Sequence, residues 1–360
     1  MSTKGDNMKR CWFATMSAGV FGIVLLSAQA QPAAKAPMFP PINPAIAKAD
    51  FTVTGLDGPG FAIAYGSEAN LLVVGCEAGT LQAFKKDTLA AFKGGAGKAD
   101  VWKGHDGPVR CVAWTGGPML ASGGTLDKKI HFWKMPEGKI AQSALVDYRI
   151  HAVAMSNDAK LFASAGESDT IQLWDATAGK PTAKLTDKMD WTLCVAFSPD
   201  SKQLLSGDYA GVVRLWDVGG KKIAELPAKP TPAPKVAPDP VAVTSVAFAP
   251  DGKAVLLGTA DGPIHFVTLA DGKIVRTFLG HTGPVTGMVF HPSGTLLATC
   301  SKDRTVKLWN PVAPAPLKSL DGHTAWIEGI TFIDQGTKLA TVGADQTVRI
   351  WDLTEAPKKK

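Results

Sequence analysis

The chain has 360 residues, of which 45% are hydrophobic and 37 are glycines, and its formal net charge is +6. This charge is mild, and three of the lysines form the terminal run Lys358–Lys360, which excludes the dense basic surface of a nucleic-acid-binding protein. The many glycines favour short strands joined by tight turns, so we expect one large domain.

The N-terminal segment has the pattern of a targeting signal. Lys9 and Arg10 precede the uncharged run 12–26, and the small residues at 28–30 fit a cleavage site. We therefore expect residues 1–30 to be a signal peptide that exports the chain to a periplasm or out of the cell. The alternative is an uncleaved anchor, which would be the chain's one contact with a membrane. Translation could start at Met1 or Met8.

A linker and a lone strand follow the targeting signal. Residues 31–49 are rich in proline and alanine, a composition typical of linkers. The run Phe51–Thr54 is rich in aromatic and β-branched residues and predicts a strand that stands outside any hairpin.

Seven repeated units make up most of the remaining chain. The fullest, Gly280–Asn310, begins with Gly-His, alternates between apolar and polar residues on both sides of a turn, and closes on a tryptophan. Units 104–134 and 322–352 match it, and in all three the tryptophan lies 28 positions after the histidine. The seven units end at positions 84, 133, 174, 216, 267, 309 and 351. Such runs predict short antiparallel strands that need neighbouring copies to bury their apolar faces.

Two insertions interrupt the period. The glycine-containing stretch 85–99 is expected to lengthen the first link between units. Residues 227–240 hold six prolines, which predicts an extended surface loop because proline fixes φ and lacks an N–H. This loop is interpreted as a stiff spacer, and the alternative is a recognition ligand for another domain.

The Gly-His start, the Ser/Thr-x-x-x-Asp turn and the Trp-Asp ending, repeated every 40–45 residues or so, resemble the WD-repeat β-propeller family, here in a bacterial-type exported form. The resemblance implies an all-β fold, a seven-bladed β-propeller of four-stranded antiparallel blades over residues 50–354, followed by a basic tail, 355–360. In this family the first strand commonly completes the last blade. Phe51–Thr54 should therefore pair with the strand that ends at Trp351 and close the ring.

Three units carry the residues of the family's buried tetrad. A buried indole N–H needs an acceptor, which a hydroxyl supplies, and the hydroxyl can bond an imidazole whose second nitrogen bonds a carboxylate. The sets are His105, Ser122, Asp127 and Trp133; His281, Thr299, Asp303 and Trp309; and His323, Thr341, Asp345 and Trp351. A nucleophilic triad is the alternative, but the set recurs in three units and lacks a strand-to-helix elbow.

Blades without the tetrad histidine are expected to depend on packing alone. The substituting residues are Leu56, Val146, Lys188 and Asp239.

The other reactive residue types form no recognisable site. Cysteines 76, 111, 194 and 300 lack zinc or haem spacing, so we expect buried free thiols, and Cys76 with Cys111 is the most plausible disulfide. The seven histidines have no metal-site pattern, and no phosphate loop or catalytic carboxylate pair stands out. We therefore predict no catalytic residue, no metal and no cofactor.

The resemblance also implies a binding face. WD-repeat propellers often grip partners on the face of the Gly-His loops, at the third and fifth residues after the histidine and at the residue before the turn aspartate. The partner-binding residues implied here are Arg110, Leu126, Arg149, His151, Trp191, Tyr209, Lys302, Trp326 and Glu328. Tryptophan and arginine dominate binding hot spots. The alternative is that Trp191 and Trp326 plug the channel mouth.

These observations predict a non-catalytic protein–protein interaction scaffold. We expect a monomeric ring in the cell envelope or secreted, which binds a protein or peptide but no nucleic acid. The alternative is a propeller enzyme or small-ligand binder that uses the central channel, whose lining candidates are Phe61, Arg110, His151, Leu193, Thr244, Thr286 and Glu328. Carboxylates or histidines converging in the channel would favour that alternative.

Overall fold

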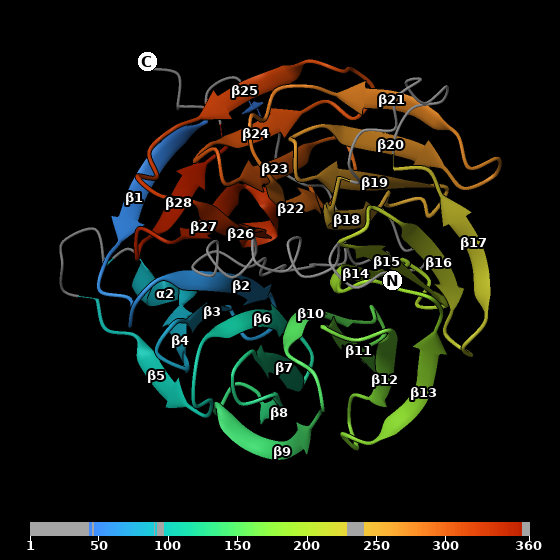
Figure 1. Ribbon diagram of the computed structural model, residues 1–360. Coiled ribbons are helices and arrows are strands. Elements are labelled where there is room, and N and C mark those ends of the chain that lie inside the picture. The colour runs from blue at the N-terminus through green and yellow to red at the C-terminus, as the bar shows by residue number, and fades with distance from the viewer. Residues whose placement is uncertain (1–42, 45–46, 90, 92–96, 229–240, 355–360) are drawn as a thin grey trace, which may run out of the picture.

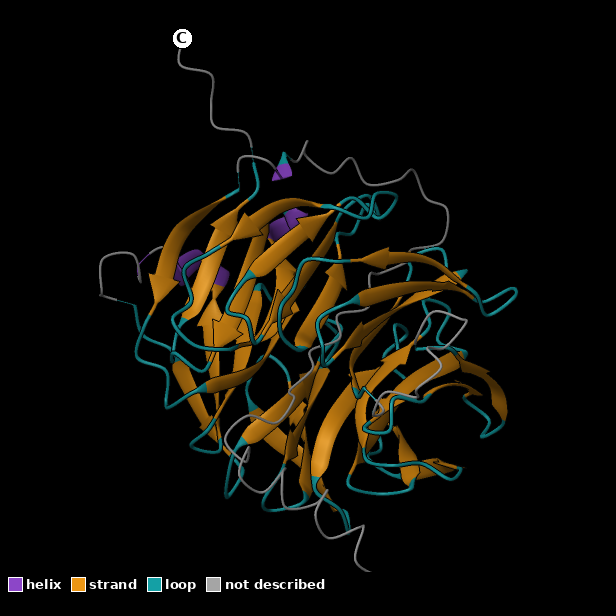
Figure 2. Cartoon of the chain, turned by 45° about the horizontal axis from the view of Figure 1, so that its top comes forward, coloured by secondary structure: helices purple, strands orange, loops and turns teal. Residues whose placement is uncertain are grey.

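The strands form a ring of seven sheets. The computed structural model describes residues 43–44, 47–89, 91, 97–228 and 241–354. Within these ranges every sheet has four antiparallel strands, and each sheet is one blade of the ring (Figure 1). The predicted all-β, seven-bladed propeller is therefore confirmed. Helical structure in the described part is confined to short turns, shown in purple in Figure 2.

The blades follow one another along the chain. Blade 1 contains β2 (Gly60–Gly66), β3 (Leu71–Cys76), β4 (Thr80–Lys85) and β5 (Asp100–Lys103). Blade 2 contains β6 (Val109–Ala113), β7 (Met119–Gly124), β8 (Lys129–Lys134) and β9 (Lys139–Leu145). Blade 3 contains β10 (Ile150–Met155), β11 (Leu161–Gly166), β12 (Thr170–Asp175) and β13 (Pro181–Thr186). Blade 4 contains β14 (Thr192–Phe197), β15 (Gln203–Asp208), β16 (Val213–Asp217) and β17 (Lys222–Leu226).

The last three blades complete the circle. Blade 5 contains β18 (Val243–Phe248), β19 (Ala254–Thr259), β20 (Ile264–Thr268) and β21 (Ile274–Phe278). Blade 6 contains β22 (Val285–Phe290), β23 (Leu297–Ser301), β24 (Val306–Trp309) and β25 (Pro316–Leu320). Blade 7 contains β26 (Ile327–Ile333), β27 (Lys338–Gly343), β28 (Val348–Asp352) and β1 (Lys48–Val53), and the 3₁₀ turn η3 (Asp334–Gly336) joins β26 to β27.

The core lies between the blades. The first strand of each blade is buried along its whole length, whereas outer strands such as β9 are mostly exposed. The apolar clusters are correspondingly shared by neighbours, since one of them joins Leu256 of blade 5 to Phe290 of blade 6. A strand covered on both faces needs a nearly continuous apolar run, which explains why the inner strands alternate less than the outer ones.

The N-terminal strand closes the ring. β1 pairs with β28 from Lys48 opposite Asp352 to Val53 opposite Val348, and Figure 1 shows the two strands side by side. The predicted pairing of residues 51–54 with the strand ending at Trp351 is therefore confirmed for residues 51–53. The strand begins at Lys48, before the expected start of the propeller at residue 50.

The first insertion lies inside a blade. Residues 85–99 were expected between two blades, but they connect β4 to β5 of blade 1 and include the short helix α2 (Lys86–Leu89). The expectation was wrong because each repeated unit ends on the third strand of a blade, so the link that follows it still contains the outer strand. Residues 1–30, 31–42, 229–240 and 355–360 lie outside the described ranges. None of the described helices has the length and apolar character needed to span a bilayer.

Candidate functional site

Each of the three predicted tetrads is joined by hydrogen bonds. In blade 6, Trp309 Nε1 donates to Thr299 Oγ1 at 2.8 Å, and this oxygen lies 2.8 Å from His281 Nε2. His281 Nδ1 lies 2.7 Å from Asp303 Oδ2. Because His281 precedes the first strand of the blade, the chain of bonds ties the loop from the previous blade to β23 and β24.

The other two tetrads repeat this geometry. In blade 2, His105 lies 2.9 Å from Asp127 Oδ2 and 2.7 Å from Ser122 Oγ, which accepts from Trp133 at 2.8 Å. In blade 7, His323 lies 2.9 Å from Asp345 Oδ2 and 2.8 Å from Thr341 Oγ1, and this oxygen accepts from Trp351 at 3.0 Å. All three histidines, their hydroxyl partners and the tryptophans are buried, which suits a structural role.

The tetrad carboxylates are acidic for a physical reason. Burial alone would raise the pKa of Asp127, but the hydrogen bond and charge of His105 and the N–H groups of Lys129 and Asp106 outweigh it and lower the pKa to about 2. For Asp345, burial is likewise outweighed, by His323 and Thr347 and by the backbone of Thr324, and the pKa is about 2. These ionised carboxylates stabilise the fold.

Two blades without the histidine have other polar networks. In blade 3, Tyr148 Oη lies 2.9 Å from Ser164 Oγ, which also accepts from Trp174 at 2.9 Å. Tyrosine thus takes the place of the imidazole. The expectation that packing alone holds this blade was wrong, and the signal in the sequence was a tyrosine two residues after Val146.

Blade 4 has a polar network built around an arginine. Trp216 Nε1 donates to Ser206 Oγ at 2.8 Å, and Arg214 donates to Asp208 at 2.6 Å and to Asp187 at 2.9 Å. Arg214 and Asp208 are both buried, so this is a paired internal charge of the kind that costs most when one partner is removed. The expectation that packing alone holds blade 4 was therefore wrong as well.

The serine or threonine hydroxyl of the second strand occurs only in blades whose third strand carries a tryptophan that can donate to it. Five blades have serine or threonine at this position of their second strand, and all five have tryptophan at the matching position of their third. Blade 1 has Val74 and Phe84 at these two positions, and blade 5 has Leu257 and Val267. The pair therefore changes together, from polar to apolar, because a buried indole N–H without an acceptor is unfavourable.

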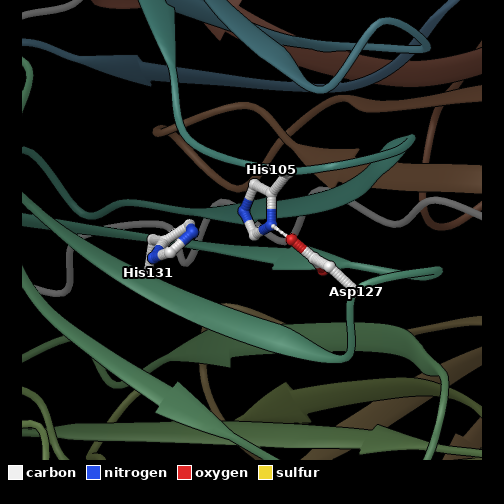
Figure 3. A group of neighbouring side chains, drawn as sticks. All are labelled: His105, Asp127 and His131. Carbon is white, nitrogen blue, oxygen red and sulfur yellow. Dashed lines mark hydrogen bonds and ion pairs between the residues drawn. The ribbon is translucent and has the colours of Figure 1, made fainter.

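One side-chain cluster has the composition of a metal site. His105, Asp127 and His131 each place a ligand atom within 4.8 Å of the others (Figure 3). Every ring nitrogen already has a partner, since His131 bonds Ser143 Oγ at 2.7 Å and the Gly104 carbonyl at 2.9 Å, and both nitrogens of His105 are held in the tetrad. A cation would have to break these bonds, so the cluster is accounted for by the fold.

The four described cysteines are free and buried, as expected. Cys76 and Cys111 are not joined. Burial raises the pKa of Cys76 to about 12 and that of Cys300 to about 12, so these thiols stay protonated and unreactive.

A β-bulge marks the same position in every inner strand. The register shifts by one residue at the fifth position after the Gly-His histidine or its substitute, as between Val285 and Gly287 in blade 6. A bulge re-aims the extra side chain relative to the rest of the strand. The extra residues are the seven predicted channel-lining candidates: Phe61, Arg110, His151, Leu193, Thr244, Thr286 and Glu328.

Three of these seven have structural partners. Thr244 donates to the Val285 carbonyl at 2.7 Å and Thr286 to the Ile327 carbonyl at 2.7 Å, so each joins its inner strand to that of the next blade. Leu193 packs with Ala242, Tyr209 and Ala260. This side of the ring axis, over blades 4 to 6, is therefore filled by packing and interblade hydrogen bonds.

A contiguous patch lies over blades 3 and 4, which we call the blade 3–4 patch (Arg149, His151, Glu167, Trp191 and Tyr209). The Trp191 ring centroid is 6.3 Å from that of His151 and 6.3 Å from that of Tyr209. Glu167 Oε1 lies 3.4 Å from His151 Nε2 and 3.8 Å from Arg149 Nη1. His151 is only 2% exposed, and the described residues supply no hydrogen bond to either ring nitrogen.

A second group extends over blades 6, 7, 1 and 2, which we call the channel-mouth cluster (Lys302, Trp326, Glu328, Phe61 and Arg110). Lys302 Nζ lies 4.5 Å above the Trp326 ring, and the Arg110 guanidinium lies 3.8 Å above the Phe61 ring. Glu328 is 0% exposed, and neither carboxylate oxygen accepts a hydrogen bond from the residues that the structure describes. Burial raises its pKa, and the charges of Lys302 and Arg110 partly offset the rise.

The predicted partner-binding residues thus form two groups and one outlier. Arg149, His151, Trp191 and Tyr209 belong to the blade 3–4 patch, and Arg110, Lys302, Trp326 and Glu328 to the channel-mouth cluster. Leu126 is in neither group; it is 61% exposed on the turn between β7 and β8.

The comparisons with known proteins agree with the architecture. The family model described as "WD domain, G-beta repeat" matches residues 98–134, 145–175, 179–217, 272–310 and 314–352, which together make up just over half of the chain. It leaves out the two units that end on Phe84 and Val267, where the tryptophan is missing.

Relatives share the repeats over part of their length. Periodic tryptophan protein 2 of Arabidopsis thaliana is 30% identical over 164 residues, which cover 45% of this chain and 17% of that protein. Nuclear distribution protein PAC1 of Coccidioides posadasii is 30% identical over 165 residues, or 42% of this chain and 34% of that protein. Striatin-4 of Mus musculus is 23% identical over 268 residues, or 69% and 35%. This chain therefore spans about a third or less of the length of these relatives. The repeat matches and the closed ring of seven blades show that the chain belongs to the WD-repeat family of β-propellers.

Proposed function

We propose that this chain is a non-catalytic scaffold that binds a protein or peptide partner on the face carrying the Gly-His loops. Propellers of the WD-repeat family are typically protein-interaction scaffolds, which supports the general function. The observation that carries the choice of face is the continuity of the blade 3–4 patch, where Trp191 contacts side chains from two blades. Large rings beside a charged pair are the composition of a binding hot spot.

The fold supplies a reason for this face to be the binding face. His281 and Asp303 are hydrogen-bonded, so the Gly-His loops and the turns before the third strands lie at one end of the blades. Neighbouring strands are antiparallel, so turns such as 156–160, between β10 and β11, lie at the opposite end. The tetrads hold the first end rigid, and a rigid surface loses less conformational entropy when a partner binds.

We also propose that the chain is exported and works in the cell envelope or outside the cell. The support is the sequence pattern of residues 1–30, a basic start, an uncharged run and small residues at 28–30. The test is to express the full chain with a C-terminal tag, separate the envelope, secreted and cytoplasmic fractions, and sequence the N-terminus of the product. A cytoplasmic product that keeps residues 1–30 would overturn this proposal and leave the binding proposal intact.

The alternative function uses the central channel. The observations that favour it are Glu328 and His151, two buried titratable side chains that both lack a hydrogen bond from the described part of the chain. They stand on β26 and β10, in blades 7 and 3, which are not neighbours in the ring. A catalytic acid–base pair needs its groups within reach of one reacting atom, so the scaffold remains the function that the geometry supports best.

Site-specific photo-crosslinking in cells that express the protein tests the scaffold proposal. The crosslinking amino acid replaces Leu126 or Trp326 on the proposed face, and Lys160 on the opposite end serves as the matched control. We expect protein adducts from the first two positions, lost when Trp191→Ala or Arg149→Ala is added while the melting curve is nearly unchanged. Adducts that form equally at all positions, or only from Lys160, would overturn the proposal. Unfolding in both alanine variants would instead favour a plugging role for Trp191.

A further inference from the structure

We propose that His151 hydrogen-bonds an uncharged polar side chain of the partner polypeptide: the hydroxyl of serine or threonine, or the amide of asparagine or glutamine. This inference rests on the proposed function and adds the chemistry of the partner. It depends on three features of the blade 3–4 patch: the unused ring nitrogens of His151, the carboxylate that faces one of them, and the charges beside them.

The fold gives His151 no hydrogen bond, although equivalent positions in the ring have one. Thr244 and Thr286, the bulge residues of blades 5 and 6, each donate to a carbonyl of the next blade. His151 is the buried bulge residue of blade 3, and neither of its ring nitrogens is hydrogen-bonded within the described part of the chain. A buried polar atom without a partner is unfavourable, so a group that supplies the missing bond gains that free energy on binding.

Glu167 leaves Nδ1 of the imidazole as the nitrogen for a partner. The approach of His151 lowers the pKa of Glu167, burial opposes this, and the charges of two nearby basic side chains add to it. The carboxylate is therefore ionised and can only accept a hydrogen bond. Because its Oε1 lies 3.4 Å from Nε2, the proton of the neutral imidazole lies on Nε2 and the lone pair on Nδ1. A partner group must donate to that lone pair.

The charges beside His151 disfavour both charged classes of ligand. The side chains of Arg149 and Glu167 are 54% and 25% exposed, so a group arriving from the Gly-His face meets them before the buried imidazole. A partner lysine or arginine would approach Arg149 and Lys128, whose charges already act on Glu167. A partner aspartate or glutamate would bring its lone pairs against the Glu167 carboxylate and the lone pair of Nδ1. A hydroxyl or an amide donates without a net charge, so it meets neither repulsion.

The three classes of ligand predict three responses to pH. Histidine takes up a second proton as the pH falls from about 8 to about 5, and Nδ1 then donates instead of accepting. An acidic ligand would bind more tightly at the lower pH, and a basic ligand would bind more weakly. A hydroxyl or an amide can turn round and accept, so its affinity should change by about twofold or less.

The other ionisable side chains at this end of β10 keep their charge over that range. The neighbouring elements contribute Arg110 and Cys111 of β6, Lys128 before β8, Asp147 and Arg149 before β10, Glu167 and Asp169 after β11, Lys188 and Asp190 before β14, Cys194 of β14, and Tyr209 after β15. Burial raises the pKa of Cys111, of Cys194 and of Tyr209, so these groups stay protonated. Carboxylate, lysine and arginine side chains titrate outside the range. A pH response of the affinity therefore reports the imidazole of His151.

The experiment uses the full chain and a phage-displayed library of random short peptides as the probe. Peptides are selected on the wild type and counter-selected on Arg149→Ala, which keeps those that bind the blade 3–4 patch. Each peptide is labelled with a fluorophore and synthesised again with every polar residue replaced in turn by an apolar residue of similar size. Fluorescence polarisation gives the affinities for the wild type, His151→Phe and His151→Asn. His265→Phe, the same exchange at a buried histidine of blade 5, is the matched control.

We expect one serine, threonine, asparagine or glutamine of each peptide to be essential, so that its replacement weakens binding about tenfold. His151→Phe should weaken the parent peptide by a similar factor and leave the replaced peptide unchanged, because both substitutions remove the same bond. His151→Asn keeps a polar group near the position of Nδ1 and should restore part of the affinity, whereas His265→Phe should have no effect. The wild-type affinity should differ by about twofold or less between about pH 5 and about pH 8.

Three results would overturn this proposal and leave the scaffold function intact. They are an essential acidic residue with tighter binding at the lower pH, an essential basic residue with weaker binding there, and an unchanged affinity in folded His151→Phe. If melting curves show that His151→Phe has lost its fold, the peptide replacements and the pH response decide the question. Crosslinks from positions 126 and 326 without any peptide that depends on Arg149 would also overturn this proposal alone. No peptide and no crosslinks would overturn both proposals.

Discussion

The hydrogen bond between a blade's hydroxyl and its tryptophan can be tested by removing each partner. Thr299→Val keeps the side-chain shape but leaves the N–H of Trp309 and the Nε2 of His281 without their partner. Both groups are buried, and an unsatisfied buried group costs about 1–3 kcal/mol. We therefore expect Thr299→Val to lower the free energy of unfolding by about 2–6 kcal/mol.

The second substitution removes the donor. Trp309→Phe has no indole N–H. Adding Thr299→Val to it therefore leaves only the His281 imidazole without its hydrogen-bond partner. The double variant then has the pair that blade 1 carries naturally, Val74 and Phe84. In the double-mutant cycle, the loss of unfolding free energy in the double variant should be smaller than the sum of the losses in the two single variants. The difference should be about 1–3 kcal/mol, which is the cost of leaving the indole N–H without an acceptor.

Urea-induced unfolding, followed by tryptophan fluorescence and circular dichroism, gives the four free energies. The matched control combines Trp309→Phe with Thr341→Val, whose indole partner is Trp351 in the next blade, so this cycle should be additive. If the Thr299–Trp309 cycle is additive within about 0.5 kcal/mol, the concerted change of the two positions across the seven blades has another cause and the reasoning is refuted.

Three further predictions concern the ring and its buried charges. Deleting residues 31–55 removes β1 and exposes the edge of β28, so the melting temperature should fall sharply; an unchanged melt would show that ring closure contributes nothing. Tyr148→Phe should lower the free energy of unfolding by about 1 kcal/mol, because the hydrogen bond to Ser164 is lost. An unchanged free energy in a urea titration would show that packing alone holds blade 3. Glu328→Gln should change the pH dependence of stability. Because burial raises the pKa of Glu328 above 4.5 in the folded chain, the wild type loses stability as the pH rises from 4.5 through the folded-state pKa, and melting curves of the variant should lack that loss.

The sequence predicted the repeating parts of the structure well. The number of units follows from a pattern that recurs at a near-constant period, and the four strands of each blade, ring closure by β1 and the three tetrads are what the resemblance to WD-repeat propellers implies. Repetition makes such a prediction strong because each unit must present the same faces to its two neighbours. The hydrogen bonds of His281 and Trp309, for example, could be anticipated from their resemblance to the buried tetrad of the family.

The parts that do not repeat were harder to predict. Tyr148 bonds the blade 3 hydroxyl in place of the imidazole, and Arg214 forms an ion-pair network of its own in blade 4; both lie at positions other than that of the histidine, so a comparison by spacing misses them. The bulge in β22 is invisible in the sequence because Val285 to Gly287 reads as ordinary alternation. The raised pKa of Glu328, and the fact that no described residue donates a hydrogen bond to it, depend on which side chains the neighbouring blades place around it, and this requires the closed ring.

The bulge positions are places where the side chain can vary while the backbone of the fold stays the same. The second and third strands reuse similar residues in most blades, with Ser or Thr and Trp at matched positions in five of the seven, because each must fill the same space between neighbours. The seven bulge positions have the same backbone geometry but hold a phenylalanine, an arginine, a histidine, a leucine, two threonines and a glutamate. Thr244 and Thr286 bond to the next blade from these positions and Leu193 packs, whereas the only charged members, Arg110 and Glu328, act on each other with Lys302. In a chain built from copies of one unit, chemistry that differs at equivalent backbone positions is where a binding preference can be encoded while the ring itself stays the same.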